Sequence, residues 1–140
     1  MANVKNYKIV GAPFSNEIEH VRVVYDFAVD GGATGVLNLV TAADQMVLKS
    51  FHARVITACV GATMVLDCGI VGVDTNRFLA DVTVAALAIN TCHIPPLVEG
   101  TPNTQLVPSI VLDAGVIAME IKTAALTAGK IEFVFGFMKA

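Results

Sequence analysis

The chain carries little charge, and positive charge is missing from a large part of it. Of the 140 residues, 15% are charged and 55% are hydrophobic, whereas about 25% of the residues in a typical soluble domain are charged. No lysine or arginine lies between Arg77 and Lys122. So few charges cannot cover the surface of a monomer in the usual way, and apolar surface is best buried against partner subunits. We therefore expect an assembling protein.

Long apolar runs are also absent. A membrane-spanning helix needs about 20 consecutive apolar residues, and the best window, Val55–Val73, is interrupted by Asp67 and by three glycines. The first 20 residues contain no apolar core of signal-peptide length. These absences predict a protein that is synthesised in a cytoplasm and has no membrane partner.

Tryptophan and basic clusters are missing too. The nine basic residues are scattered along the chain, whereas a nucleic-acid surface needs a basic stripe, so nucleic acid is not an expected partner. The three cysteines, Cys59, Cys68 and Cys92, include no closely spaced pair. This spacing disfavours both structural zinc and a disulfide framework. We expect three buried, reduced thiols.

A search for catalytic groups finds almost none. The three histidines are far apart in the sequence, and no Gly-x-Ser-x-Gly elbow or phosphate-binding glycine loop occurs. We therefore expect no enzymatic activity, no cofactor and no metal. Asp67 is unusual because it interrupts an apolar segment. An outward-facing or paired carboxylate is the favoured interpretation of Asp67, with a metal or catalytic role as the alternative.

The sequence does contain a series of β-type segments separated by turns. His20–Ala28 alternates apolar and polar residues, as a half-buried strand does. Further segments of this kind are Thr34–Val40, Met46–Cys59, Thr63–Gly72, Gln105–Leu112, Val116–Thr123 and Lys130–Phe137. Seven or eight strands at this spacing predict an all-β fold, an antiparallel β-sandwich of the jelly-roll type. A short helical turn is expected near residues 76–82, capped by Asp74 or Thr75.

Two segments outside the regular strands are candidates for contacts with partners. We divide the chain into an N-terminal arm, residues 1–19, and a single β-sandwich domain, residues 20–140. The arm is either a partly ordered tail or an anchor that docks on a neighbouring protein through its apolar residues Tyr7, Ile9 and Phe14. The proline-rich loop Cys92–Asn103 excludes regular structure, and its residues Ile94, Pro95, Pro96 and Leu97 are candidates for contacts between subunits.

Three stretches of the sequence resemble a known family. They are Val23–Ala33 (VVYDFAVDGGA) followed by Gly35–Leu37, then Val71–Ala80 (VGVDTNRFLA), and Ala124–Phe133 (AALTAGKIEF). In these stretches the chain resembles the head decoration, capsid cement or head fibre proteins of tailed bacteriophages. The stretches are turns and strand ends and contain no catalytic residues.

The resemblance implies a jelly-roll-like sandwich, often trimeric, that binds the outside of the capsid and cements it. The expected partners are the major capsid protein and further copies of the chain, and the expected location is the capsid exterior after synthesis in the host cytoplasm. The alternative is a ligand- or carbohydrate-binding β-sandwich with a receptor-binding role on the virion. Sugar sites use exposed aromatic side chains, and Tyr25, one of only two tyrosines, is placed inward by the alternation, which counts against this alternative.

Overall fold

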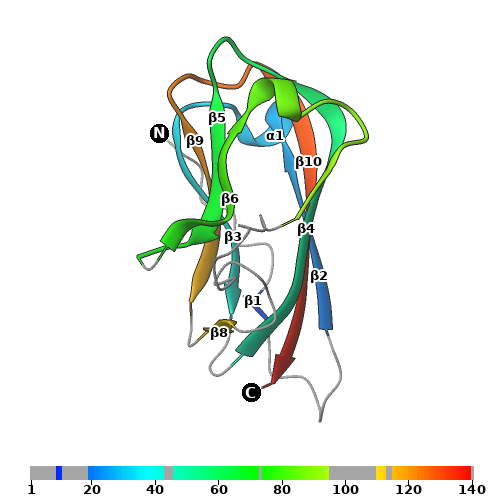
Figure 1. Cartoon of the computed structure of the whole chain (residues 1–140), viewed down its shortest axis with the longest axis vertical. Helices are drawn as coiled ribbons and strands as arrows, with labels where there is room; N and C mark the ends of the chain where they lie inside the picture. The colour runs from blue at the N-terminus through cyan, green and yellow to red at the C-terminus, as the bar shows by residue number, and fades with distance from the viewer. Residues whose placement is uncertain are drawn as a thin grey trace, which may run out of the picture.

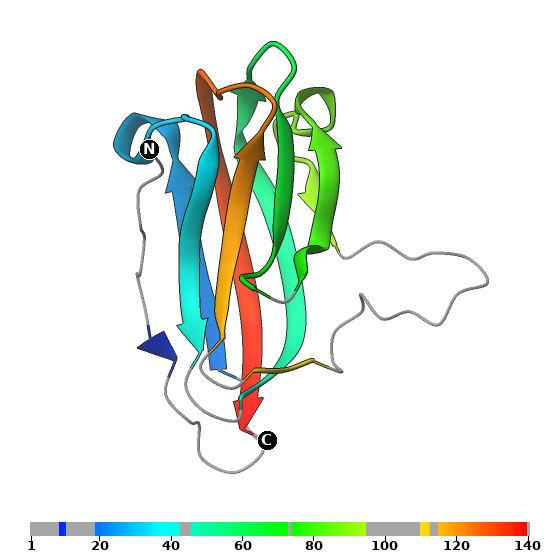
Figure 2. The same ribbon diagram turned by 90° about the vertical axis from the view of Figure 1, so that its left-hand side faces the viewer.

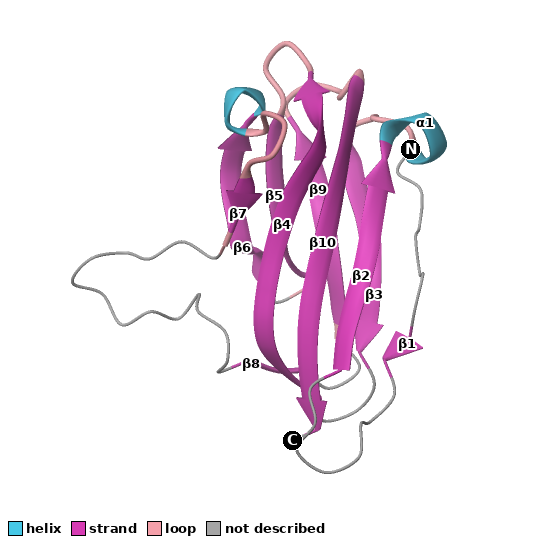
Figure 3. Cartoon of the chain, turned by 90° about the vertical axis from the view of Figure 1, so that its right-hand side faces the viewer, coloured by secondary structure: helices cyan, strands magenta, loops and turns pink. Residues whose placement is uncertain are grey.

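The chain forms two β-sheets that pack face to face (Figures 1 and 3). The computed structural model describes residues 9–10, 19–42, 46–72, 74–94, 110–112 and 115–139. Apart from the four-residue helix α1 (Phe27–Asp30) and the 3-10 turn η1 (Val84–Ala86), the regular structure in these residues is β-strand. The strands are β1 (Ile9–Val10), β2 (Glu19–Asp26), β3 (Gly35–Ala42), β4 (Met46–Val60), β5 (Val65–Ile70), β6 (Asp74–Thr83), β7 (Cys92–His93), β8 (Ile110–Leu112), β9 (Val116–Lys122) and β10 (Ala128–Lys139).

The order of the strands is that of a jelly roll. Sheet A has the order β1-β3-β9-β5-β6, and Figure 2 shows it facing the viewer. Sheet B has the order β2-β10-β4-β7, with β8 also paired to β4. Without the short strands β1 and β8, two four-stranded antiparallel sheets remain, with the orders β3-β9-β5-β6 and β2-β10-β4-β7. In each sheet a strand from the C-terminal part of the chain lies between two strands from earlier in the chain, as in the two Greek keys of a jelly roll. The predicted all-β jelly-roll sandwich is therefore confirmed.

Phenylalanine rings connect the two sheets within a core that is otherwise mainly aliphatic. Strand β10 places Phe133, Phe135 and Phe137 in the core, where each is fully buried. Phe51 of β4 stacks on Phe78 of β6 with 5.0 Å between the ring centroids, which joins sheet B to sheet A. Such an aromatic pair contributes about 0.5–1.5 kcal/mol beyond its buried area. The inward face of β2 (Val21, Val23 and Tyr25) is also buried, as its alternation predicts.

The helical turn predicted near residues 76–82 is wrong, because these residues lie within β6. Phe78 and Leu79 are buried in the core, and Cys68 of β5 pairs with Leu79. The free energy of burying these two large side chains outweighs the local capping tendency of Asp74 and Thr75. A helical turn does follow, but it is the 3-10 turn η1, which begins at Val84.

Apart from the hairpin of β5 and β6, several connections in this chain lead from one sheet to the other, as between β2 and β3, β3 and β4, and β4 and β5. Strand β4 pairs with β10, whereas β5 pairs with β6 and β9. The Gly61 turn therefore connects strands of different sheets and does not place Cys59 beside Met64, as a hairpin would. The Asp-Ala-Gly sequence at 113–115 predicts a further hairpin, and this prediction is wrong, because β8 pairs with β4 whereas β9 pairs with β3 and β5.

Candidate interaction surfaces

Three connections and η1 gather at one end of the sandwich, which we call the loop end. It consists of residues 27–34, 60–64, 83–91 and 123–129, and Figures 1 and 2 show α1, η1 and these connections together at the same end. Backbone hydrogen bonds join the segments: Leu126 N donates to Gly32 O at 2.8 Å, and Thr127 N donates to Val60 O at 2.7 Å. Cys59 N, one residue before the second segment, donates to Leu87 O at 3.0 Å. The connections therefore support one another.

Close packing at the loop end requires glycine. A Cβ atom on Gly32 would lie 2.1 Å from the carbonyl oxygen of Leu126, and one on Gly61 would lie 2.8 Å from that of Ala125. Both distances are shorter than a Cβ atom tolerates. Two of the stretches that carry the family resemblance, Val23–Ala33 and Ala124–Phe133, thus pack against each other here. Their role in this chain is structural.

Helix α1 is held in place by hydrogen bonds of the side chains of Tyr25, Asp26 and Asp30. Ala28 N donates to the Asp26 carboxylate at 3.0 Å, and Asp26 N donates to the Asp30 carboxylate at 2.9 Å. The Tyr25 hydroxyl donates to Gly31 O at 2.6 Å. Burial is the main cause that raises the pKa of Tyr25 above its usual range. Tyr25 is completely buried, so the predicted inward position is confirmed and its ring cannot stack on a sugar.

On the outer face of sheet B, one glutamate lies between two arginines. Glu132 of β10 pairs with Arg22 of β2, and its other oxygen lies 3.5 Å from Arg54 Nε of β4. The hydrogen bond from Arg22 is the main cause that lowers the pKa of Glu132. The carboxylate is only 8% exposed, so the two arginines compensate the removal of its charge from water.

On the outer face of sheet A, Asp67 is held by a lysine and by a backbone amide. Lys122 Nζ lies 2.8 Å from Asp67 and 2.8 Å from Asp81, and Asp81 N donates to Asp67 at 2.7 Å. The hydrogen bond to Asp67 is the main cause that raises the pKa of Lys122. Asp81 has a positive φ of 50° at an irregularity in the pairing of β5 with β6. The interpretation of Asp67 as a paired carboxylate is confirmed.

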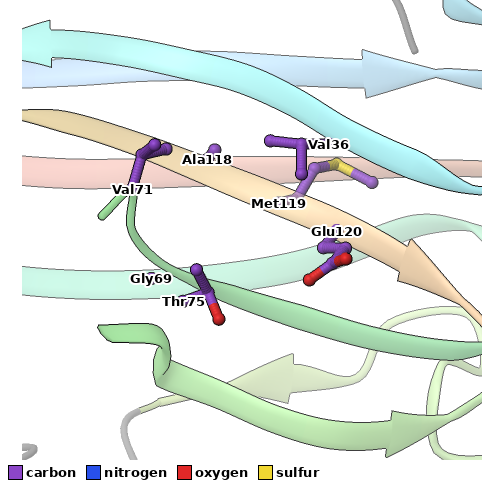
Figure 4. A pocket seen from close by; sticks show the side chains of 7 residues that line it. All are labelled: Val36, Gly69, Val71, Thr75, Ala118, Met119 and Glu120. Carbon is purple, nitrogen blue, oxygen red and sulfur yellow. The ribbon is translucent and has the colours of Figure 1, made fainter. Parts of the chain in front are cut away.

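Sheet A also has a small hollow on its outer surface (Figure 4). Gly69 of β5 and Ala118 of β9 are paired across the strands, and their minimal side chains leave the space open. Val36, Val71 and Glu120 are among the surrounding residues. The hollow has a volume of about 270 Å³ including open solvent, below the range of roughly 300–1,000 Å³ for small-molecule sites, and no aromatic ring lines it. It therefore gives no support to a carbohydrate-binding role.

The cysteines differ from the expectation in one case. Cys59 and Cys68 are buried and free, as predicted, and burial raises the pKa of Cys59 to about 11. Cys92 is also free, but it is exposed, so the prediction of three buried thiols is wrong for this residue. The reason is its position in β7, a two-residue strand at the edge of sheet B.

The described residues contain no obvious chemical centre. Within these ranges no three His, Cys, Asp or Glu side chains gather as they would around a metal ion. His93 Nε2 lies 3.0 Å from Ala86 O, a contact that ties β7 to η1. None of the helical segments in the described part of the chain has the length and apolarity to cross a lipid bilayer.

Most of the contact candidates from the sequence lie outside the described residues. This applies to Tyr7 and Phe14 of the arm and to Pro95, Pro96 and Leu97 of the proline-rich loop. Ile9 is in β1, which pairs in parallel with β3 through Ile9–Thr41 and Val10–Ala42. Ile94 follows β7 and is 61% exposed. The roles of these residues in binding stay predictions.

The features that sequence reasoning missed are the loop end and the partners of Asp67. Lys122 is 55 positions from Asp67, and no local pattern connects the two residues. The Asp-Gly-Gly sequence at 30–32 predicts only a turn, whereas the nearby backbone of Leu126 is what requires glycine at position 32. Both features depend on which strands become neighbours.

Comparison with known proteins shows a likeness of fold. No protein-family model matches the sequence, and curated proteins also give no match. A chain from the capsid of Ralstonia phage GP4 superposes with a TM-score of 0.63 at 12% identity, over 95% of this chain and 92% of that one. A chain from the capsid asymmetric unit of cyanophage Pam1 gives a TM-score of 0.58 at 11% identity, over 97% and 94% of the two chains. This protein therefore shares its fold, over almost its whole length, with chains found in two phage capsids.

Proposed function

We propose that this protein is a structural component of a phage virion that binds the outer surface of the capsid and stabilises it. The observation that carries the proposal is the likeness to chains from two phage capsids, which covers more than 90% of each of them. A fold alone does not define a function. The low charge content of the sequence and the resemblance of its three stretches to capsid cement proteins support the same role.

The proposed partners are the major capsid protein and further copies of this chain in a homotrimer. Ile94, exposed beside the proline-rich loop, is proposed to contact a neighbouring subunit together with Pro95, Pro96 and Leu97. Sedimentation of the purified protein tests the trimer. A clean monomer at roughly tens of micromolar would contradict it, since association depends on protomer concentration.

The N-terminal arm is proposed to add a second attachment to the capsid through Tyr7, Ile9 and Phe14. A segment that becomes ordered on binding can reach across a junction between subunits, at a cost in conformational entropy. Deleting residues 1–18 removes the two-residue strand β1 but leaves β2 complete, since β2 begins at Glu19. The shortened protein should keep its unfolding transition and bind undecorated capsids more weakly. Equal binding would exclude the arm as an anchor.

Stabilisation of the capsid is tested by heating decorated and undecorated particles. A protein that binds the mature shell adds stability that grows with its concentration relative to the dissociation constant. Undecorated particles should therefore release their DNA at a lower temperature, as measured by the fluorescence of a DNA-binding dye. Equal release temperatures would mean that the protein decorates the capsid without cementing it.

A further inference from the structure

We infer that the loop end is the surface that meets the capsid, so that the sandwich stands end-on upon the shell. This inference rests on the proposed function and adds an orientation and a chemistry to it. The partner surface would be an uncharged, partly apolar patch of the capsid shell. The contact would bury apolar area without a need for salt bridges.

The first observation is the absence of exposed charge at the loop end. Among residues 27–34, 60–64, 83–91 and 123–129 the one charged residue is Asp30, which is only 7% exposed. The charges that border these segments are paired with each other, Lys130 with Asp26 and Lys122 with Asp81. In an average soluble protein about a quarter of the residues are charged. Depletion of charged residues is the compositional signal of the core of a protein interface.

The second observation is exposed apolar area at the same end. Val29 of α1 is 72% exposed, Ile89 after η1 is 58% exposed, and Val60 at the end of β4 is 52% exposed. Most other exposed side chains in these segments are alanine or threonine. Burying such short side chains costs little rotamer entropy.

The third observation is that the loop end is already ordered in the isolated chain. The bond from Leu126 to Gly32 and the bond from Thr127 to Val60 connect three segments, and Gly32 and Gly61 allow their close approach. A surface that is fixed before binding avoids the entropy cost of ordering it in the complex.

The opposite end and the sheet faces differ in their charge. At the opposite end, sheet B carries Glu19 and Lys49. The outer faces carry charges that are paired within the chain, around Glu132 and around Asp67. Charged and internally paired surfaces are suited to solvent, which leaves the loop end as the surface for an uncharged partner.

A second copy of the chain is the competing occupant of the loop end. Two copies that met there would lie tip to tip, and each would hide its charge-free end from the shell. Copies that associate side by side, with Ile94 in the contact, would instead present all their loop ends in one direction. We therefore assign the loop end to the shell.

The test introduces charge at the loop end without changing the core. Val29→Glu and Ile89→Glu are compared with Val71→Glu, a matched control at a 44% exposed valine away from the loop end. All three variants should unfold like the parent protein. Binding is measured by co-sedimentation with capsid particles from a phage that lacks the gene for this protein. We expect about tenfold weaker binding or more for the two loop-end variants, because an unpaired charge is buried in the contact, and less than about a twofold change for the control.

The outcomes separate the inference from the function on which it rests. If the parent protein does not bind the particles, the proposed function fails. If it binds and the loop-end variants bind equally well, or if Val71→Glu weakens binding as much as they do, the orientation is wrong. A changed sedimentation coefficient of Val29→Glu with unchanged capsid binding would also overturn the inference, because the loop end would then be a contact between copies.

Discussion

The outer faces of the two sheets and the loop end are held together in different ways. On the faces, side-chain ion pairs connect neighbouring strands, as Glu132 does between Arg22 and Arg54. At the loop end, close backbone contacts and hydrogen bonds connect the segments, with Asp30 as the one charged residue. A chain with so few charges thus pairs many of them within itself, and it leaves one end whose burial requires no desolvation of an exposed charge.

This contrast predicts that the loop end is most sensitive to added volume. Gly32→Ala would place a Cβ atom against the backbone of Leu126, so the connection must move. We expect the free energy of unfolding to fall by about 2–3 kcal/mol in urea denaturation. The control is Ala33→Ser at the next, exposed position, which should change the free energy by less than about 0.5 kcal/mol. Equal stability of both variants would show that the close contact is unimportant.

The ion pairs on sheet A should give a smaller effect. Lys122→Met leaves the buried Asp67 carboxylate with the amide of Asp81 but without its cation. The urea midpoint should fall, although less than for Gly32→Ala, because Lys122 is about one-third exposed (34%). Adding Asp67→Asn to Lys122→Met should recover part of the loss, since the uncompensated charge is then removed. Additive losses in the double variant would contradict the coupling.

The contribution of the sheet B ion pairs to the stability of the folded chain should depend on pH. The pKa of Glu132 is lowered in the folded chain, so its contribution is present above the unfolded pKa of about 4.3 and is lost as the pH falls through the folded value. Glu132→Gln should therefore be less stable than the parent at pH 7, by about 1 kcal/mol or less. The two thermal midpoints should converge on acidification. A difference that does not depend on pH would assign the effect to packing instead.

Thiol labelling should distinguish the exposed Cys92 from the buried Cys59 at the loop end, and it requires no change to the core. Cys92 is exposed, whereas Cys59 is buried next to Gly129 at the edge of the loop end. A maleimide at neutral pH should label one thiol per folded chain, and Cys92→Ser should abolish this reaction. Burial and the raised pKa of Cys59, about 11, both disfavour its thiolate. Rapid labelling of Cys59 would mean that the loop end opens.

The sequence allowed the strands to be predicted well and their neighbours poorly. Alternation in β2 and the apolar character of β10 predict two strands whose inward residues are buried as expected. A turn such as Gly61 shows that the chain changes direction, but not that β5 joins the other sheet. For this reason the ion pair of Asp67 with Lys122 and the contact of Gly32 with Leu126 were not predictable. The strand β6 was missed because its burial depends on Phe51, which lies in the opposite sheet.

The position of β10 has a consequence for synthesis of the protein. This last strand lies between β2 and β4, two strands that are made much earlier. Until the ribosome has released residues 128–139, β2 and β4 lack their common neighbour, and the core lacks Phe133, Phe135 and Phe137. Sheet B can therefore close only after residues 128–139 have left the ribosome, and the nascent chain exposes apolar strand edges up to that moment.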